Sequence, residues 1–187
     1  MIYPQKISSK KSDKIINIFI FTSVIIALLL ITINKLTTPE IPWSALANCG
    51  IIYTWITVIY SIKKGTNIAG HVLIQTILTS IVVLYIDKTI GYHGWSVYIA
   101  IPIILMIANI TMLILTIISY KRYVKYAIYQ LMIVLISLMP IILIAKGIIE
   151  EKILIRTAID ISVLSLMISV SLCYKDMKEA IVRKIHM

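Results

Sequence analysis

The most constraining feature of this sequence is a series of six apolar stretches, each long enough to cross a membrane. A hydrocarbon core about 30 Å thick requires roughly 20 apolar residues in a helix. Lipid offers no partner to backbone N–H and C=O groups, and the alternation of barrel strands is absent, so each stretch is predicted to be a helix. The predicted spans are residues 15–34, 43–62, 68–86, 97–119, 126–145 and 153–174.

Composition supports a membrane protein. Hydrophobic residues make up 60% of the chain and charged residues 14%, and the mean hydropathy is +0.98. Soluble domains are about 45–50% apolar and about 25% charged, so a soluble enzyme and a disordered chain are excluded. The spans leave room only for a basic segment at 1–14 and a basic tail at 175–187, on either side of a transmembrane domain at 15–174.

Lysine and arginine are distributed unequally between alternate connections. Thirteen lie in the terminal segments and in the connections after the second and fourth spans, and four lie in the other connections. The positive-inside rule places the richer set in the cytoplasm. We therefore predict that both termini are cytoplasmic, in a multi-pass protein of the bacterial cytoplasmic membrane. The net charge of +10 then faces anionic lipid headgroups, and no folded basic domain is present to bind nucleic acid.

The connections between spans are short, which predicts an all-α integral membrane protein built from three antiparallel hairpins. Two of the connections lead into a Trp-Ser pair, at Trp43-Ser44 and at Trp95-Ser96. The repetition fits an internal repeat, but it also fits the preference of tryptophan for the membrane interface, which we favour.

Ionisable residues inside a span are functional candidates because they are expensive to bury in lipid. Arg156 and Asp160 stand four residues apart in the sixth span, so they share a helix face and are expected to pair. A ligand site and a self-neutralised structural pair are the two interpretations, and the second is favoured.

In the third span, His71, Gln75 and Thr79 recur at every fourth residue and form a polar stripe. Such a stripe serves a ligand or protons in some proteins, but hydrogen bonding between helices is the favoured interpretation. Pro102 and Pro140 each remove a backbone donor and are expected to bend their helices, and such kinks can shape a central cavity.

The densest group of polar side chains is the connection at 87–96, where Asp87, His93 and Trp95 are candidate ligand-binding residues together with Arg156 and Asp160. One histidine and one aspartate fall short of the three or four ligands of a metal site. Cys49 and Cys173 have no Cys or His at ligand spacing, so we predict no metal and no cofactor.

Several short motifs recur along the chain in a recognisable order: Trp43-Ser44, Trp55, Lys63-Lys64, Asn67-Ile68, Gly91 to Ser96, Ile101-Pro102 and Arg183 to His186. With these motifs the chain resembles a family of six-helix membrane proteins of unknown function from Firmicutes, whose members often begin with a zinc ribbon of paired CxxC knuckles. This sequence has no cysteine before Cys49, so the ribbon is absent from it. The resemblance implies the architecture and no catalytic residues.

These observations predict a non-enzymatic membrane subunit or sensor that binds a small molecule, a lipid or a membrane-protein partner. The alternative is the substrate-binding component of a small-molecule transporter of the energy-coupling-factor type. Those components dock through an AxxxA face on their first helix, whereas the first span here has one alanine, Ala27. A membrane enzyme is the weakest alternative.

Overall fold

The computed structural model describes residues 9–64, 67–118 and 123–185, and all regular structure within these ranges is helical. Six helices are long and apolar enough to cross a membrane, which confirms the predicted number of spans. The chain divides into two compact units, Met1–Ile56 and Thr57–Met187, and each is considered by itself. The helices are α1 (Ser9–Thr37), α2 (Trp43–Lys64), α3 (Ile68–Thr89), the π-helical turn η1 (Ser96–Ala100), α4 (Ile101–Ile118), α5 (Tyr123–Ala145) and α6 (Ile153–Ile185).

The helices begin close to where the apolar stretches begin, but α1 and α6 extend beyond the predicted spans. Helix α1 begins at Ser9, within the predicted N-terminal segment, and α6 continues to Ile185, within the predicted tail. Hydropathy detects only the part of a helix that lipid covers, whereas the backbone hydrogen bonds continue into polar sequence.

The first unit contains α1 and the N-terminal part of α2. None of the residues in the apolar window of α1 is buried. The indole Nε1 of Trp55 donates a hydrogen bond of 2.9 Å to Ser23 Oγ, which connects the two helices.

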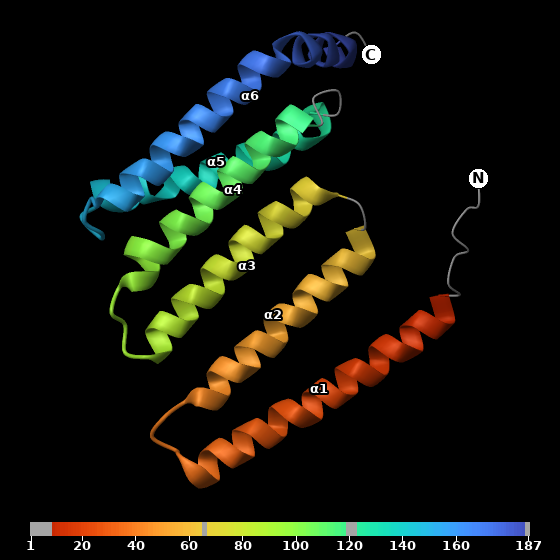
Figure 1. Cartoon of the computed structure of the whole chain (residues 1–187), viewed down its shortest axis with the longest axis vertical. Coiled ribbons are helices and arrows are strands. Elements are labelled where there is room, and N and C mark those ends of the chain that lie inside the picture. Colours follow the sequence, from red (N-terminus) through yellow and green to blue (C-terminus); the bar gives the residue numbers. More distant parts are fainter. Residues whose placement is uncertain (1–8, 65–66, 119–122, 186–187) are drawn as a thin grey trace. The chain divides into compact units, whose positions relative to one another are not determined.

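In the second unit, α4 is central and packs against α3, α5 and α6 (Figure 1). Helix α3 also packs against α5, and α5 against α6. Small residues allow this close approach, because Ala69 and Ala108 form the core together with Met112 and Ile133. Large aliphatic side chains such as Ile107, Leu135 and Leu164 remain exposed on the outside of the unit, the surface that a lipid environment requires.

The entry to α4 contains one π-helical turn. The N–H of Ile101 bonds the carbonyl of Ser96, five residues earlier, and Pro102 follows immediately. Proline donates no hydrogen bond, so the helix cannot continue its regular pattern through this point. The irregularity beside Pro102 is this widened turn, which carries Tyr98.

Candidate functional site

The connection between α3 and α4 is organised by a buried carboxylate. Asp87, fully buried, accepts hydrogen bonds from the hydroxyl of Ser96 at 2.6 Å and from its N–H at 3.3 Å. Its other oxygen accepts the N–H of His93 at 2.9 Å. A buried carboxylate requires such donors, and Asp87 thereby fastens the end of α3 to the start of η1. Asp87, a candidate ligand-binding residue, is occupied in holding the turn together.

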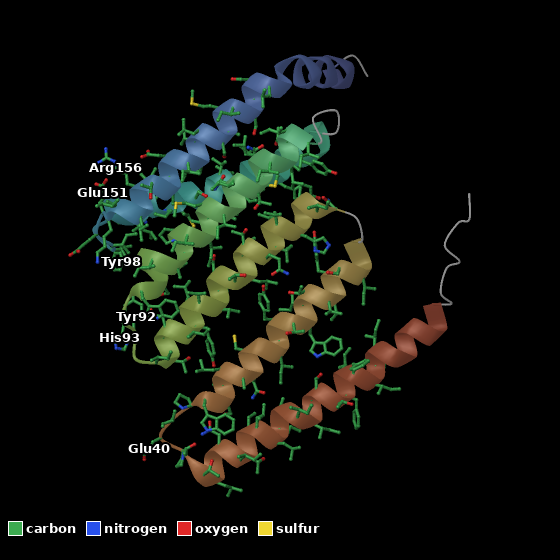
Figure 2. All side chains as sticks on the ribbon, viewed as in Figure 1. Glu40, Tyr92, His93, Tyr98, Glu151 and Arg156 are labelled. Atoms are coloured by element: carbon green, nitrogen blue, oxygen red, sulfur yellow. The ribbon has the colours of Figure 1, made fainter. Side chains whose placement is uncertain are left out.

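The backbone of this connection explains its glycines. Gly91 and Gly94 have φ angles of 113° and 76°, which glycine adopts without a Cβ penalty. Tyr92 has a φ of 48°, uncommon for a residue with a side chain, and its N–H bonds the carbonyl of Asp87 at 2.8 Å. The sharp reversal leaves the side chains of Tyr92 and His93 exposed (Figure 2).

In the connection between α1 and α2, an amide side chain takes the place of the carboxylate and likewise accepts hydrogen bonds from a serine. The Oδ1 of Asn34 accepts the hydroxyl of Ser44 at 2.7 Å and its N–H at 3.1 Å. The Nδ2 of Asn34 donates to the carbonyls of Thr38 at 2.6 Å and Ile41 at 2.8 Å. We call residues 34–44 and 87–96 the first and second Ser turns. The two Trp-Ser pairs thus share a hydrogen-bonding arrangement as well as two residue types.

A groove of about 600 Å³ joins the second Ser turn to the start of α6. We call it the Tyr98 groove. It brings together two of the predicted site residues, His93 and Trp95, with side chains more than fifty positions later in the sequence. Its lining is His93, Gly94, Trp95, Tyr98, Ile99, Glu151, Lys152, Ile153 and Leu154.

Tyr98 connects the two sides of this groove. Its hydroxyl accepts the N–H of Glu150 at 3.4 Å, and the Lys152 ammonium lies 4.0 Å from the centre of its ring. Beside it, Arg156 Nη1 lies 3.6 Å from Glu151 Oε1. Both side chains of this pair are exposed, at 73% and 56%. Figure 2 shows Tyr98, Glu151 and Arg156 at the same end of the second unit as Tyr92 and His93.

Arg156 therefore pairs with a residue other than Asp160, the partner predicted for it. Its ion pair is with Glu151, in the connection, whereas Asp160 is exposed one turn further along α6 and does not line the groove. The arginine side chain extends toward the helix end, where water is accessible, instead of toward the next turn.

The polar stripe on α3 does line a groove, of about 390 Å³, against α4. His71 packs edge-on against Tyr60 with ring centres 4.8 Å apart, and Gln75 Nε2 donates to Thr57 Oγ1 at 3.0 Å. Thr79 lies in the same lining as His71 and Gln75. These contacts join α3 to the C-terminal part of α2, which agrees with the favoured interpretation of hydrogen bonding between helices.

A third space, a cavity of about 260 Å³, lies among α3, α4, α5 and α6, and it is lined by Pro102 and Pro140. We call it the proline cavity. Its walls are aliphatic apart from the side chains of Ser80 and Ser137. Pro140 has no N–H, so the carbonyl of Ile136, another lining residue, loses its regular helical partner. The remaining lining residues are Leu84, Val97, Ile101, Pro102, Leu105, Met139, Leu143, Ile149, Ile155 and Ala158.

Sequence reasoning missed a buried polar ladder between α4, α5 and α6. Asn109 Nδ2 donates to Ser137 Oγ at 3.0 Å, and Ser165 Oγ donates to Asn109 Oδ1 at 3.3 Å. Gln130 Nε2 donates to Ser169 Oγ at 2.8 Å. Interhelical hydrogen bonds of this kind stabilise membrane bundles. The available signal was the spacing of Ser162, Ser165 and Ser169, which places three small polar residues on one helix face.

Six apolar helices, an aliphatic outer surface in the second unit and a polar ladder inside it define a multi-pass membrane protein. The chain belongs to DUF6320, a family of unknown function whose match covers residues 3–187. The resemblance to a family of unknown function is thereby confirmed at that level. Neither the curated proteins nor the solved structures contain a match to this chain. Among the described residues, no three His, Cys, Asp or Glu side chains gather as a metal site would require.

Proposed function

We propose that this protein binds an apolar molecule, such as a lipid acyl chain, in the proline cavity. The observation that carries the proposal is an aliphatic cavity of about 260 Å³ within the four-helix packing of a membrane protein. Two of its lining side chains, Leu84 and Met139, are exposed, so the cavity opens on the outer surface of the unit, where an acyl chain can enter it. Ligand sites are mostly apolar, with a small number of polar groups that orient the ligand.

The polar groups of the cavity narrow the ligand class. The hydroxyl of Ser80 donates to the carbonyl of Thr76 at 2.7 Å, and that of Ser137 donates to the carbonyl of Ile133 at 2.9 Å. The hydroxyl oxygen of Ser80 still has acceptor capacity, as does the carbonyl of Ile136, whereas Ser137 Oγ already accepts Asn109 Nδ2. A ligand with a single hydroxyl or amide donor on an apolar body matches this lining. We propose binding without catalysis, since Asp87, the acid of the second Ser turn, is engaged in the turn.

We further propose that the helices form three antiparallel hairpins in the bacterial cytoplasmic membrane, with both termini in the cytoplasm. The asymmetry of lysine and arginine supports this orientation. Reporter fusions at Lys63, Lys88, Lys121 and Lys146 should read inside, outside, inside and outside. Any other order contradicts the proposed threading.

The binding proposal is tested by filling the cavity. Ala158 is buried in its wall, and Ala158→Phe places a ring in the space, whereas Ala145→Phe adds the same ring at an exposed position of α5. Both proteins are purified in maltoside detergent and titrated with a fluorescent polyene fatty alcohol. We expect binding to weaken about tenfold or more in Ala158→Phe, which corresponds to ~1.4 kcal/mol, and to be unchanged in Ala145→Phe.

A second variant changes the volume of the lining less, so it still tests the proposal if Ala158→Phe fails to fold. Ser80→Val removes one hydroxyl of the lining and adds little volume, so it should weaken binding of the alcohol more than binding of the matching hydrocarbon. Equal binding of both probes by the wild type, Ala158→Phe and Ser80→Val would refute the proline cavity as the binding site.

A further inference from the structure

We propose that the Tyr98 groove is a receptor for an organic ammonium group, and that, when no ligand is bound, Lys152 covers the Tyr98 ring and Arg156 pairs with Glu151 of the lining. The groove combines the ring of Tyr98 and the indole of Trp95 with the carboxylate of Glu151. An aromatic face beside a carboxylate is the chemistry that recognises ammonium groups. This site is separate from the proline cavity, and none of the lining residues is shared.

The first argument is that both cation acceptors of the groove already hold a cation. The Lys152 ammonium lies 4.0 Å from the centre of the Tyr98 ring, within the range of a cation–π contact. The Arg156 guanidinium lies 3.6 Å from the Glu151 carboxylate. The geometry of the groove therefore accepts positive charge at two neighbouring positions, and the chain supplies its own cations to both.

The second argument is that these internal contacts are easily exchanged. Arg156 and Glu151 are exposed at 73% and 56%, and exposed ion pairs contribute little to stability. Lysine carries its charge on a long, flexible stem, which moves aside without a change in the backbone. An external ammonium group replaces Lys152 on Tyr98 while the lysine returns to water, where its charge is solvated.

The third argument is the shape and position of the groove. Its volume of about 600 Å³ exceeds what one lysine side chain requires, and Ile99, Ile153 and Leu154 provide apolar walls beside the aromatic ones. A trimethylammonium group has a diffuse charge and a hydrophobic surface, so it suits aromatic and aliphatic walls together. The groove lies where α6 begins and where η1 follows the second Ser turn, so it is open to ligands at the helix ends.

The test uses tetramethylammonium as the probe and tert-butyl alcohol as its neutral counterpart of similar shape. Saturation-transfer NMR follows both compounds with the full chain in maltoside micelles, which contain no ammonium headgroup. We expect the wild-type protein to bind tetramethylammonium in preference to the alcohol. Lys152→Ala should bind it about threefold more tightly, because the ring is released from its internal cation.

Variants of the two acceptors complete the test. Tyr98→Phe keeps the aromatic face and loses only the hydroxyl that accepts the N–H of Glu150, so it should retain binding. Tyr98→Leu and Glu151→Gln should each weaken binding about threefold or more. Glu151→Gln is an exposed, isosteric change and so remains informative if Tyr98→Leu fails to fold. Weaker binding by Lys152→Ala, or no preference for the cation in any variant, overturns the proposal.

Discussion

The two Ser turns solve the same structural problem with different chemistry. In each, a side chain at the end of one helix binds both the hydroxyl and the N–H of a serine at the start of the next. Asn34 is neutral and uses its amide as acceptor and donor, whereas Asp87 only accepts. The first turn satisfies two carbonyls through Asn34, while the second arranges three donors around one carboxyl group.

This difference explains the different loops. A carboxylate attracts N–H groups, and the second turn presents the N–H of His93 to it by way of the left-handed conformations at Gly91 and Tyr92. The amide of Asn34 instead draws the carbonyls of Thr38 and Ile41 inward. The second turn therefore directs the side chain of His93 outward at the Tyr98 groove.

The largest effect is expected from Asp87→Ala, because the carboxyl group that closes the second turn is lost. The hydroxyl and N–H of Ser96 and the N–H of His93 lose their acceptor together. We expect the melting temperature in detergent to fall by about 5 °C or more, with faster amide exchange at 87–96 and none of this at 34–44. Unchanged exchange at 87–96 would show that the carboxylate does not organise the turn.

Exchanging the two polar groups should show that they are not equivalent. Asn34→Asp places carboxylate oxygens against the carbonyls of Thr38 and Ile41, and Asp87→Asn turns an NH₂ group toward donors of the second turn. Each exchange should lower the melting temperature by about 4 °C. The double variant should show no recovery, since each exchanged group is mismatched with the donors or carbonyls of its own turn. An unchanged melting temperature in both single variants would show that an amide and a carboxyl group serve equally well in either turn.

The two serines offer a milder comparison. Ser96→Ala removes a hydroxyl bonded to a carboxyl group, and Ser44→Ala removes one bonded to an amide. Hydrogen bonds to a charged group are about twice as strong, so the loss of melting temperature should be about twice as large for Ser96→Ala. Both substitutions introduce alanine, which keeps the start of the helix intact. Equal losses would indicate that the charge of Asp87 adds nothing.

The smallest effect concerns the tryptophans of the two turns. Trp43 Nε1 donates to Thr38 Oγ1 at 2.8 Å, whereas Trp95 lines the Tyr98 groove. Trp43→Phe should therefore lower stability by ~1 kcal/mol, and Trp95→Phe by less. Thermal melts of the two variants measure the difference. If Trp95→Phe is the more destabilising change, the indole of Trp95 has a structural role that the groove does not explain.

The fold was largely predictable because lipid imposes one simple requirement. Trp43 and Ile68 begin α2 and α3 at the predicted positions, since a helix starts where an apolar stretch follows a polar connection. The π-helical turn at 96–100 was not predictable, because Pro102 indicates a disturbed helix and not which irregular form relieves it.

The candidate sites were predictable only in part. His93 and Trp95 were identified from the density of polar groups in one connection, but their neighbours Glu151 and Lys152 arrive from a distant segment. The residues of one connection do not predict which other connection lies beside it in the folded chain. Asn109 and Gln130 escaped notice because each is a single polar residue in a long apolar run, and partners from other helices give it its role.

The polar ladder has a consequence for synthesis in the membrane. Asn109 in α4 precedes Ser137 of α5 and Ser165 of α6 in the chain, so it enters the lipid before them. The amide of Asn109 gains Ser137 when α5 is inserted and Ser165 only with the last helix, and Gln130 likewise gains Ser169 only with α6. A nascent chain that stops before α6 lacks these last two serine partners. The final helix thus supplies the last hydrogen bonds of the ladder, so the polar packing of these helices is complete only once α6 has been inserted.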